Sequence, residues 1–450
     1  MELFPAPDDT IEGVSQALRT GRTTCAEVTR ACLAAIDARE HEIHAWADLD
    51  RDGAMIQAEE LDLDLAQRHW HGFLHGIPLG IKDIIDVAGI PTRAGASFTD
   101  GRPARSDATV VARLRAAGAV ILGKTATTQF ACFDPAETRN PWSLDRTPGG
   151  SSSGSAAALA SGMCLGALGT QTGGSITRPA AYCGIAGCKP TFRHVSSYGV
   201  WPLAFSLDHP GPMARTVADL AILLDVIAGY DRRDPRSARE PPPAVLSALE
   251  EDTLRPPALG RLRGPFEERA DAAVRESFEH ALDVFRRSGG RVVEISLPGA
   301  FEGLSNCHRT IMAVEAAESH AERFEQHRDA YRPSVRALVE EGLSIRGIDY
   351  VRCRHHQAEL RREMRLVMDE AEVLVCPAVP GPAPDLSTTG DPVFNVPWSY
   401  VGFPTVSFPM GLSAEGLPLG LQLVGREFGE AALFRGAAWC ERELRRRYGW

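Results

Sequence analysis

The chain has 450 residues, of which 44% are apolar and 24% are charged, and it carries a net charge of -11 at pH 7. This length allows one large domain or two to three average ones, with enough apolar residues for a sizeable core. The acidic balance argues against nucleic acid or an anionic membrane surface as the main partner, because both bind basic faces.

The sequence shows no targeting or membrane-spanning signal. The stretch MELFPAPDDTIEG lacks the basic and apolar regions of a secretory signal. There is no uncharged apolar run of about 18 residues, and the ten cysteines form no CxxC pair. These patterns predict a cytoplasmic protein with reduced thiols. A monomer or a homodimer is expected, and the oligomeric state stays open.

Helices and strands alternate over the first half of the chain. A capping box of Thr24 and Glu27 begins the first predicted helix, and a second helix is expected over 52–67. Apolar residues alternate over 77–81 between glycines, which predicts a strand. Residues 106–122 indicate a helix, a glycine stop and a buried strand. This alternation predicts α/β architecture with a mainly central sheet.

The second half is predicted to be largely helical before it returns to strands. An amphipathic helix is expected over 215–229. Residues 231–260 are rich in proline and charge and form the most linker-like segment, and long helical stretches are expected over 268–288 and 308–372. Three strand candidates then close the chain, in VLVCPAVPGPAP, FPTVSFPMGL and LPLGLQLVG.

The stretch GTQTGGSITRPA, which contains Ser175, is the first candidate for chemistry. A serine hydroxyl attacks a carbonyl only when a base removes its proton, and the resulting oxyanion needs backbone N–H donors. The glycines before Ser175 let the backbone turn so that its N–H groups can point at one oxyanion. The residues that would supply these groups are Thr172, Gly173, Gly174 and Ser175. On this motif alone, a plain glycine turn and a nucleophile loop are equal alternatives.

Lys82 is the candidate base, because none of the 13 histidines lies in a recognisable catalytic signature. It follows the apolar run GIPLGI, where burial would lower its pKa from the ordinary value of about 10.4. A pKa of about 8 requires roughly 3 kcal/mol of destabilisation of the charged form. Taken alone, the motif favours the alternative of a lysine at a strand end, paired with Asp83 or Asp86.

A third motif, TPGGSSSGSAAA, places Ser151 in a glycine- and serine-rich loop ahead of a helix of small residues. It matches G-x-S-x-G through Gly150, Ser152 and Gly154, but it does not follow an apolar strand as a nucleophile elbow does. It also lacks GK[ST], which argues against a phosphate-binding P-loop. Its meaning therefore depends on the other two motifs.

Together the three motifs resemble the amidase signature family of serine amidohydrolases. The resemblance is carried by GIPLGIKD around Lys82, PGGSSSGSAAALASG around Ser151 and GTQTGGSITRPAAYCGIAGCKPT around Ser175, with both serines at the family's spacing. It continues through SLDHPGPMARTVADLAILL and reaches GDPVFNVPWSYVGFPTVSFPMGL and GLPLGLQLVG. It therefore covers almost the whole chain.

The resemblance implies a catalytic triad of Lys82, Ser151 and Ser175. Ser175 would attack the carbonyl, while Ser151, after a cis peptide bond, would relay the proton to neutral Lys82 and later return it to the leaving amine. The N–H groups from Thr172 to Ser175 would form the oxyanion hole. Water would then hydrolyse the acyl-enzyme, and neither a metal nor a cofactor is expected.

The resemblance also implies the fold. We expect one large α/β domain over residues 1–450, with a central mixed sheet of about eleven strands covered by helices on both faces. Within it, a signature core would occupy about 70–220, a helical excursion about 231–372 and a C-terminal sheet part 373–450.

Three positions depart from the commonest family pattern. Gln171 stands where many members have Asp, Arg178 lies three residues after the nucleophile where many have arginine at two, and Gln129 replaces a common glutamate. None of them removes a triad member, and the role of Gln171 stays open.

Two further groups are weaker candidates for a site. His69, His71 and His75 offer zinc ligands, but carboxylates or thiols at standard spacing are missing nearby. Cys183 and Cys188 are expected to pack as small hydrophobes rather than act as nucleophiles.

Substrate-pocket residues are expected near the C-terminal motifs. Phe394 and Trp398, in a proline-flanked loop, and Gln129 are the candidates, although core packing is an alternative for the aromatic residues. No charged group that reads the substrate is evident. We therefore expect a hydrolase of small-molecule linear or aryl amides, which as an aryl acylamidase or urethanase would extend to carbamates and esters.

A second hypothesis is the glutaminase subunit of a tRNA-dependent amidotransferase, because similar chains serve there inside an obligate complex. This hypothesis predicts glutamine hydrolysis that depends on a partner. The segment FACFDPAET does not resemble that subunit's usual GSSTENSA stretch, which counts against it.

Overall fold

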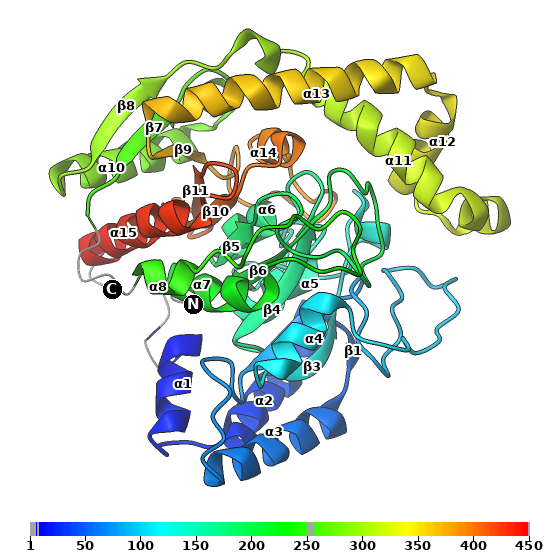
Figure 1. The fold of residues 1–450 in the computed structure, drawn as a ribbon, viewed down its shortest axis with the longest axis vertical. Coiled ribbons are helices and arrows are strands. Elements are labelled where there is room, and N and C mark those ends of the chain that lie inside the picture. Colours follow the sequence, from blue (N-terminus) through cyan, green and yellow to red (C-terminus); the bar gives the residue numbers. More distant parts are fainter. Residues whose placement is uncertain (1–5, 7–8, 250–254, 449–450) are drawn as a thin grey trace.

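An eleven-stranded mixed sheet runs through the protein and carries helices on both faces (Figure 1). The computed structural model describes residue 6 and residues 9–249 and 255–448. In spatial order the strands are β1 (Trp46–Leu49), β3 (Val120–Thr125), β2 (Pro78–Lys82), β4 (Gly166–Gln171), β6 (His209–Ala214), β5 (Ala186–Lys189), β10 (Thr405–Leu412), β11 (Pro418–Val424), β9 (Val373–Pro377), β7 (Ala258–Leu262) and β8 (Arg291–Ile295). This single α/β domain confirms the expected fold.

Parallel and antiparallel pairs divide the sheet. The strand β2 runs parallel to β3 and β4, and β7 runs parallel to β8 and β9. The pairs from β4 through β6, β5, β10 and β11 to β9 are antiparallel, as is the pair of β1 with β3. Every residue of β2 and β4 is buried, as expected for strands covered on both faces.

One edge of the sheet collects the ends of three neighbouring strands. The parallel strands β2 and β4 end at Lys82 and Gln171. The antiparallel strand β6 begins at His209, opposite Gln171. Because ligands of open α/β sheets bind at the carboxyl ends of parallel strands, this edge is where a site is expected.

The helices of the first half confirm the predicted elements. The capping box is present, with Thr24 Oγ1 accepting from the Glu27 N–H and the Glu27 carboxylate accepting from the Thr24 N–H. The helices are α1 (Ile11–Arg19), α2 (Cys25–Ile43), α3 (Arg51–Ala66), α4 (Thr109–Ala116), α5 (Ser153–Ala160), α6 (Thr177–Cys183), α7 (Val217–Ile227) and α8 (Val245–Leu249). The small residues of α5 allow close packing, since a Cβ at Gly154 would lie 2.2 Å from Ala45 O.

The second half contains the helical stretches that the sequence predicted. The stretch 308–372 consists largely of three α-helices that pack together at one end of the molecule (Figure 1). Pro333 has no N–H and occupies the first turn of the middle helix, so a new helix starts there. The helices are α9 (Pro265–Glu268), α10 (Ala272–Arg287), α11 (Leu304–His327), α12 (Pro333–Ser344), α13 (Gly347–Val367), α14 (Val396–Val401) and α15 (Glu430–Tyr448).

The segment 231–372, expected to be a helical excursion, also contributes two strands. Both β7 and β8 extend the sheet beyond β9. Their charges hide the strand pattern, because β7 contains Arg261, which pairs with Glu267 and Glu279. The linker-like segment 231–260 includes α8, and its residues 250–254 lie outside the described residues.

Candidate active site

Lys82 ends β2 with a fully buried side chain. Its Nζ donates to Ser151 Oγ at 2.8 Å and to Thr170 Oγ1 at 2.8 Å, and it lies 3.4 Å from Thr170 O. Burial lowers the pKa of this amine well below its usual value, while the negative charge of Asp208 opposes the shift. The arrangement favours a neutral amine, which is the form a base requires.

Ser151 lies in the turn before α5 and follows a cis peptide bond from Gly150, as the resemblance implies. Its hydroxyl contacts Lys82, and its side chain lines a cavity that Ser175 also lines. The N–H of the next residue, Ser152, donates to Ser175 O at 3.3 Å. The turn is therefore tied directly to the loop that carries Ser175.

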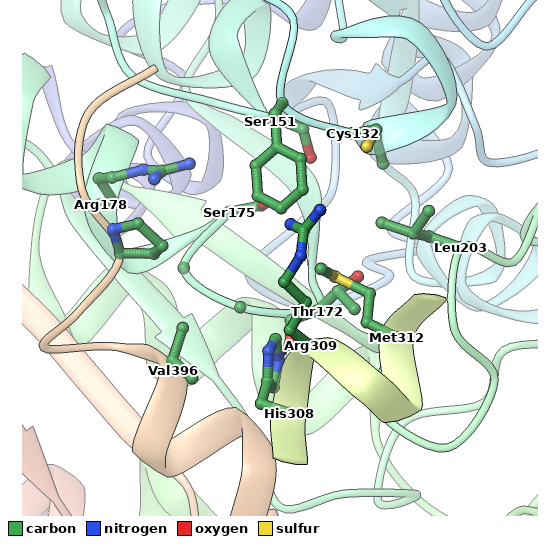
Figure 2. A pocket seen from close by; sticks show the side chains of 15 residues that line it. Cys132, Ser151, Thr172, Ser175, Arg178, Leu203, His308, Arg309, Met312 and Val396 are labelled. Carbon is green, nitrogen blue, oxygen red and sulfur yellow. Dashed lines mark hydrogen bonds between the residues drawn. The ribbon is translucent and has the colours of Figure 1, made fainter. Parts of the chain in front are cut away.

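Ser175 lies in the loop between β4 and α6 and is 8% exposed. Four residues of this loop, Thr172, Gly173, Gly174 and Ser175, line the cavity (Figure 2). Within the described part of the chain, no hydrogen bond engages the N–H groups of the last three. These donors are free to bind a carbonyl oxygen that becomes negative.

The two glycines of this loop differ in the space around them. A Cβ at Gly174 would lie 2.7 Å from Asn395 Oδ1, so the site admits no side chain unless Asn395 moves. At Gly173 the nearest atom belongs to Val396, 3.5 Å away, which is ordinary van der Waals contact. The close approach of the C-terminal segment to the loop therefore requires glycine only at position 174.

Gln171, whose role the sequence left open, holds the loop that carries Ser175 in place. Its Oε1 accepts from the N–H groups of Ile176 and Thr177 at 2.9 and 3.0 Å and from Thr177 Oγ1 at 3.1 Å. Its Nε2 donates to Ser399 Oγ at 3.2 Å, and Ser399 Oγ in turn donates to Gly173 O at 2.7 Å. One amide thus fixes the loop on both sides of Ser175.

Arg178 joins three segments that surround the cavity. Its guanidinium is buried and donates to Gly150 O at 2.6 Å, to Thr389 Oγ1 at 3.2 Å and to Gly390 O. Burial lowers its pKa to about 10, so it stays protonated at neutral pH. It fixes the peptide that precedes Ser151 and lines the cavity with its own side chain.

The helix α11 lines the cavity beside Thr172, at the start of the loop that carries Ser175 (Figure 2). His308 is buried and its Nε2 donates to Thr172 O at 2.9 Å. Burial lowers its pKa to about 4, so the imidazole is neutral at pH 7. Arg309 lies at the same wall and makes a bidentate ion pair with Glu341. No motif in the sequence pointed to this helix, because its site residues have no characteristic spacing.

The other walls of the cavity are largely apolar. They come from the segment after β3, the segment before β6, the helix α11 and the segment leading into α14. The residues concerned are Ala131, Cys132, Phe133, Leu203, Met312, Pro392 and Val396. The cavity thus combines one polar side around the two serines with apolar surfaces elsewhere.

The three residues expected to form the substrate pocket lie elsewhere. Phe394 and Trp398 are fully buried and pack against Phe266. The amide of Gln129 donates to Ala330 O and accepts from the N–H of Arg332. None of the three lines the cavity at Ser175, because the chain turns their side chains toward the core or toward the start of α12.

The weaker candidates also have structural partners. His71 pairs with Asp64 at 2.8 Å, and the ring of His75 stacks on that of Trp70. Among the described residues, no cluster of three or more His, Cys, Asp or Glu side chains could hold a metal ion. Cys183 and Cys188 are buried, and burial raises the pKa of both thiols. No described helix is both long and apolar enough to span a membrane.

Comparisons with known proteins agree with this geometry. A family model for amidases matches residues 27–434. The chain is 38% identical to the glutamyl-tRNA(Gln) amidotransferase A subunit of Chloroflexus aggregans, over 95% of this chain and 94% of that protein. It is 37% identical to AmiD, a Mycobacterium tuberculosis protein named as an amidase, over 94% and 91% of the two chains. The X-ray structure of the peptide amidase from Stenotrophomonas maltophilia superposes with a TM-score of 0.86 at 30% identity, over 97% of both chains. The chain therefore belongs to the amidase signature family of hydrolases.

Proposed function

We propose that the chain is a serine amidohydrolase with Ser175 as nucleophile, Ser151 as proton relay and Lys82 as base. The observation that carries this proposal is the 2.8 Å contact between Lys82 Nζ and Ser151 Oγ, at the wall of the cavity that Ser175 also lines. A buried neutral amine next to a hydroxyl is able to accept its proton.

In this proposal, Ser175 Oγ attacks the carbonyl carbon of an amide. Its proton passes to Ser151, while the proton of Ser151 passes to the amine of Lys82. The carbonyl oxygen becomes an oxyanion that accepts hydrogen bonds from the free N–H groups of the loop. Collapse then breaks the C–N bond, and the leaving amine takes a proton back along the same path. Water hydrolyses the ester on Ser175 and releases the acid.

The cavity walls support neutral, largely apolar amides as substrates. Leu203, Met312 and Val396 offer apolar surface, and the cation of Arg309 is paired with Glu341. Linear and aryl amides are therefore the proposed substrate class. Carbamates and esters present the same planar carbonyl, so an aryl acylamidase or urethanase activity is chemically consistent with this site.

A substrate panel tests this proposal. The purified protein is incubated at pH 8 with an anilide, a primary amide and an aryl carbamate, with Ser175→Ala as the blank, and the products are identified by mass spectrometry. We expect an acid and an amine from at least one compound, only with the wild type. Turnover by Ser175→Ala at the wild-type rate would refute the nucleophile, and inert anilide and carbamate would refute the aryl activity.

The identity to an amidotransferase subunit favours a second candidate, the glutaminase subunit of such a complex. The segment FACFDPAET counts against it, since it contributes Cys132 and Phe133 to the cavity and differs from that subunit's usual sequence. The tagged chain is purified from its native cells and assayed for conversion of glutamine to glutamate. Co-purified partner chains together with glutaminase activity would replace the first candidate.

A further inference from the structure

Asp208, to which the sequence motifs assigned no role, lies at the edge of the sheet that carries the site. It directly precedes β6, whose first residue, His209, pairs with Gln171 at the end of β4. This register places Asp208 beside Thr172, the first residue of the loop that carries Ser175. The neighbouring strand on the other side of β4 is β2, which ends at Lys82.

Both oxygens of the Asp208 carboxylate accept hydrogen bonds from neutral donors. Oδ1 accepts from Thr172 Oγ1 at 2.5 Å. Oδ2 accepts from the N–H groups of Leu203 and Ala204 at 2.9 and 3.0 Å. No ion pair reaches Asp208 among the residues that the structure describes. The carboxylate is therefore held firmly, but its charge is not cancelled by a contacting cation.

The protonated form of Lys82 is stabilised by a nearby negative charge. Its Nζ contacts two hydroxyls and one carbonyl, and the carboxylate of Asp208 is the charge that opposes the effect of burial on its pKa. When Lys82 takes the proton from Ser151, a cation forms where water cannot solvate it. A fixed negative charge at this edge of the sheet lowers the free energy of that cation.

We infer that Asp208 is a positioning residue of the site. It holds Thr172 at the start of the loop that carries Ser175, and it supplies the negative charge that stabilises protonated Lys82. This inference rests on the proposed function, because it presupposes that Lys82 is the base. One carboxylate thus acts on two neighbouring strands, because Thr172 follows β4 and Lys82 ends β2.

The charged and titratable groups around Asp208 are consistent with an ionised carboxylate at pH 8. Burial raises its pKa to about 6, and the negative charge of Glu315 on α11 adds to this shift. Glu315 is bound by Ser206 and Tyr350 and lies beside Arg354. The neighbouring imidazoles, His209 on β6 and His308 on α11, have pKa values lowered by burial and are neutral at this pH.

The test uses a probe that needs no knowledge of the substrate. An alkyl fluorophosphonate reacts with an activated serine, fluoride leaves, and the adduct on Ser175 is counted by intact-protein mass spectrometry. The second-order rate of labelling is measured from pH 4.5 to 9.5. The rising limb of this profile reports the ionisation that produces the active base.

Asp208→Asn keeps the size of the side chain and removes its charge. We expect the plateau rate to fall about tenfold or more, and the rising limb to move to lower pH by about one unit. The sign follows because the loss of a nearby negative charge disfavours protonated Lys82, so that the neutral amine appears at lower pH. A fall in rate with an unmoved limb would overturn the inference.

Two matched variants separate charge from position. Thr172→Val removes the hydroxyl that Asp208 holds but keeps the carboxylate, so we expect a slower plateau with the limb shifted by less than about 0.3 units. Glu315→Gln removes a second carboxylate, which binds Ser206 in the turn before Asp208. We expect the rising limb of this variant to stay at the wild-type pH. A limb shift of about one unit in either variant would contradict a specific role for Asp208.

Asp208→Glu keeps the test decisive if the Asn variant does not fold. This variant retains the charge and displaces it by one methylene. We expect a lower labelling rate, with the rising limb near the pH of the wild type. A rising limb one pH unit lower would contradict the inference. Failure of the proposed function is seen separately. If Ser175→Ala is labelled, or if Lys82→Met is labelled at the wild-type rate, the triad itself is refuted.

Discussion

The site is built from two regions of different character, the strand edge and the helical wall. The strand edge comprises the ends of β2 and β4 and the start of β6, where Lys82, Gln171 and Asp208 are held by buried strands and several hydrogen bonds each. The helical wall is α11, from which His308, Arg309 and Met312 line the cavity. The helices α12 and α13 pack against α11 and expose large apolar side chains such as Leu343 and Ile348. We propose that the strand edge performs the chemistry and that the helical wall selects the substrate.

The largest expected effect comes from the strand edge. Ser175→Ala and Lys82→Met should each lower kcat/KM by at least about 10³-fold, because they remove the proposed nucleophile and base. Lys82→Met keeps a side chain of similar length, so a melting temperature near that of the wild type shows that the fold is intact. Activity of Lys82→Met within tenfold of the wild type would refute the base assignment.

Two neighbouring glycines offer a sharper comparison within the loop. Gly174→Ala should lower kcat by about 10²-fold, because its Cβ would displace Asn395 or the loop and misalign the N–H donors. Gly173→Ala meets no atom closer than 3.5 Å and should lose about ten times less activity. Steady-state kinetics of the two variants side by side check this order. Equal losses would show that the close approach to Asn395 is not what requires glycine.

The sequence motifs pointed to three residues of the site, whose catalytic roles are proposals, because the neighbours of these residues are constrained by backbone geometry. Lys82, Ser151 and Ser175 lie in motifs whose glycines and apolar runs are needed for tight turns and buried strands, so the pattern survives in the sequence. The role of Gln171 was not predictable, because its four hydrogen bonds to Ile176, Thr177 and Ser399 are set by how the loop folds back on β4 and α14.

The residues that line the rest of the cavity, and two of the strands, could not be predicted in the same way. Phe394 and Trp398 looked like pocket residues because aromatic side chains near a loop suit either a pocket or a core, and the packing on Phe266 decides between these. Conversely, His308 and Met312 lie on a long helix whose register toward the cavity depends on tertiary packing. The strands β7 and β8 escaped prediction because they are short and carry charges.

Met312→Ala tests the proposed role of the helical wall in specificity. This change enlarges the apolar side of the cavity without touching the strand edge. We expect KM for a good apolar substrate to rise about tenfold, with kcat changed less than about threefold, since a lost apolar contact costs about 1–3 kcal/mol of binding. An equal fall in kcat with unchanged KM would place Met312 with the chemistry instead.

The smallest expected effect comes from Arg309, a partly exposed residue of the helical wall. Arg309→Ala removes an ion pair with Glu341 in which both side chains are partly exposed, and such pairs contribute about 0–1 kcal/mol to stability. We expect kcat/KM for a neutral amide to change less than about threefold. Glu341→Gln serves as the matched control. A loss above about 30-fold in Arg309→Ala alone would make Arg309 a group that reads the substrate.

The central claim, that neutral Lys82 activates Ser175 through Ser151, is tested most directly by the pH dependence of fluorophosphonate labelling. Burial lowers the pKa of Lys82, and the neutral form is the base, so the rate must rise with pH through that pKa and then level off. We expect this rising limb in the wild type, no adduct in Ser175→Ala and labelling slowed by at least about 10³-fold in Lys82→Met. A rate that is flat from pH 4.5 to 9.5, or equal in wild type and Lys82→Met, would contradict it.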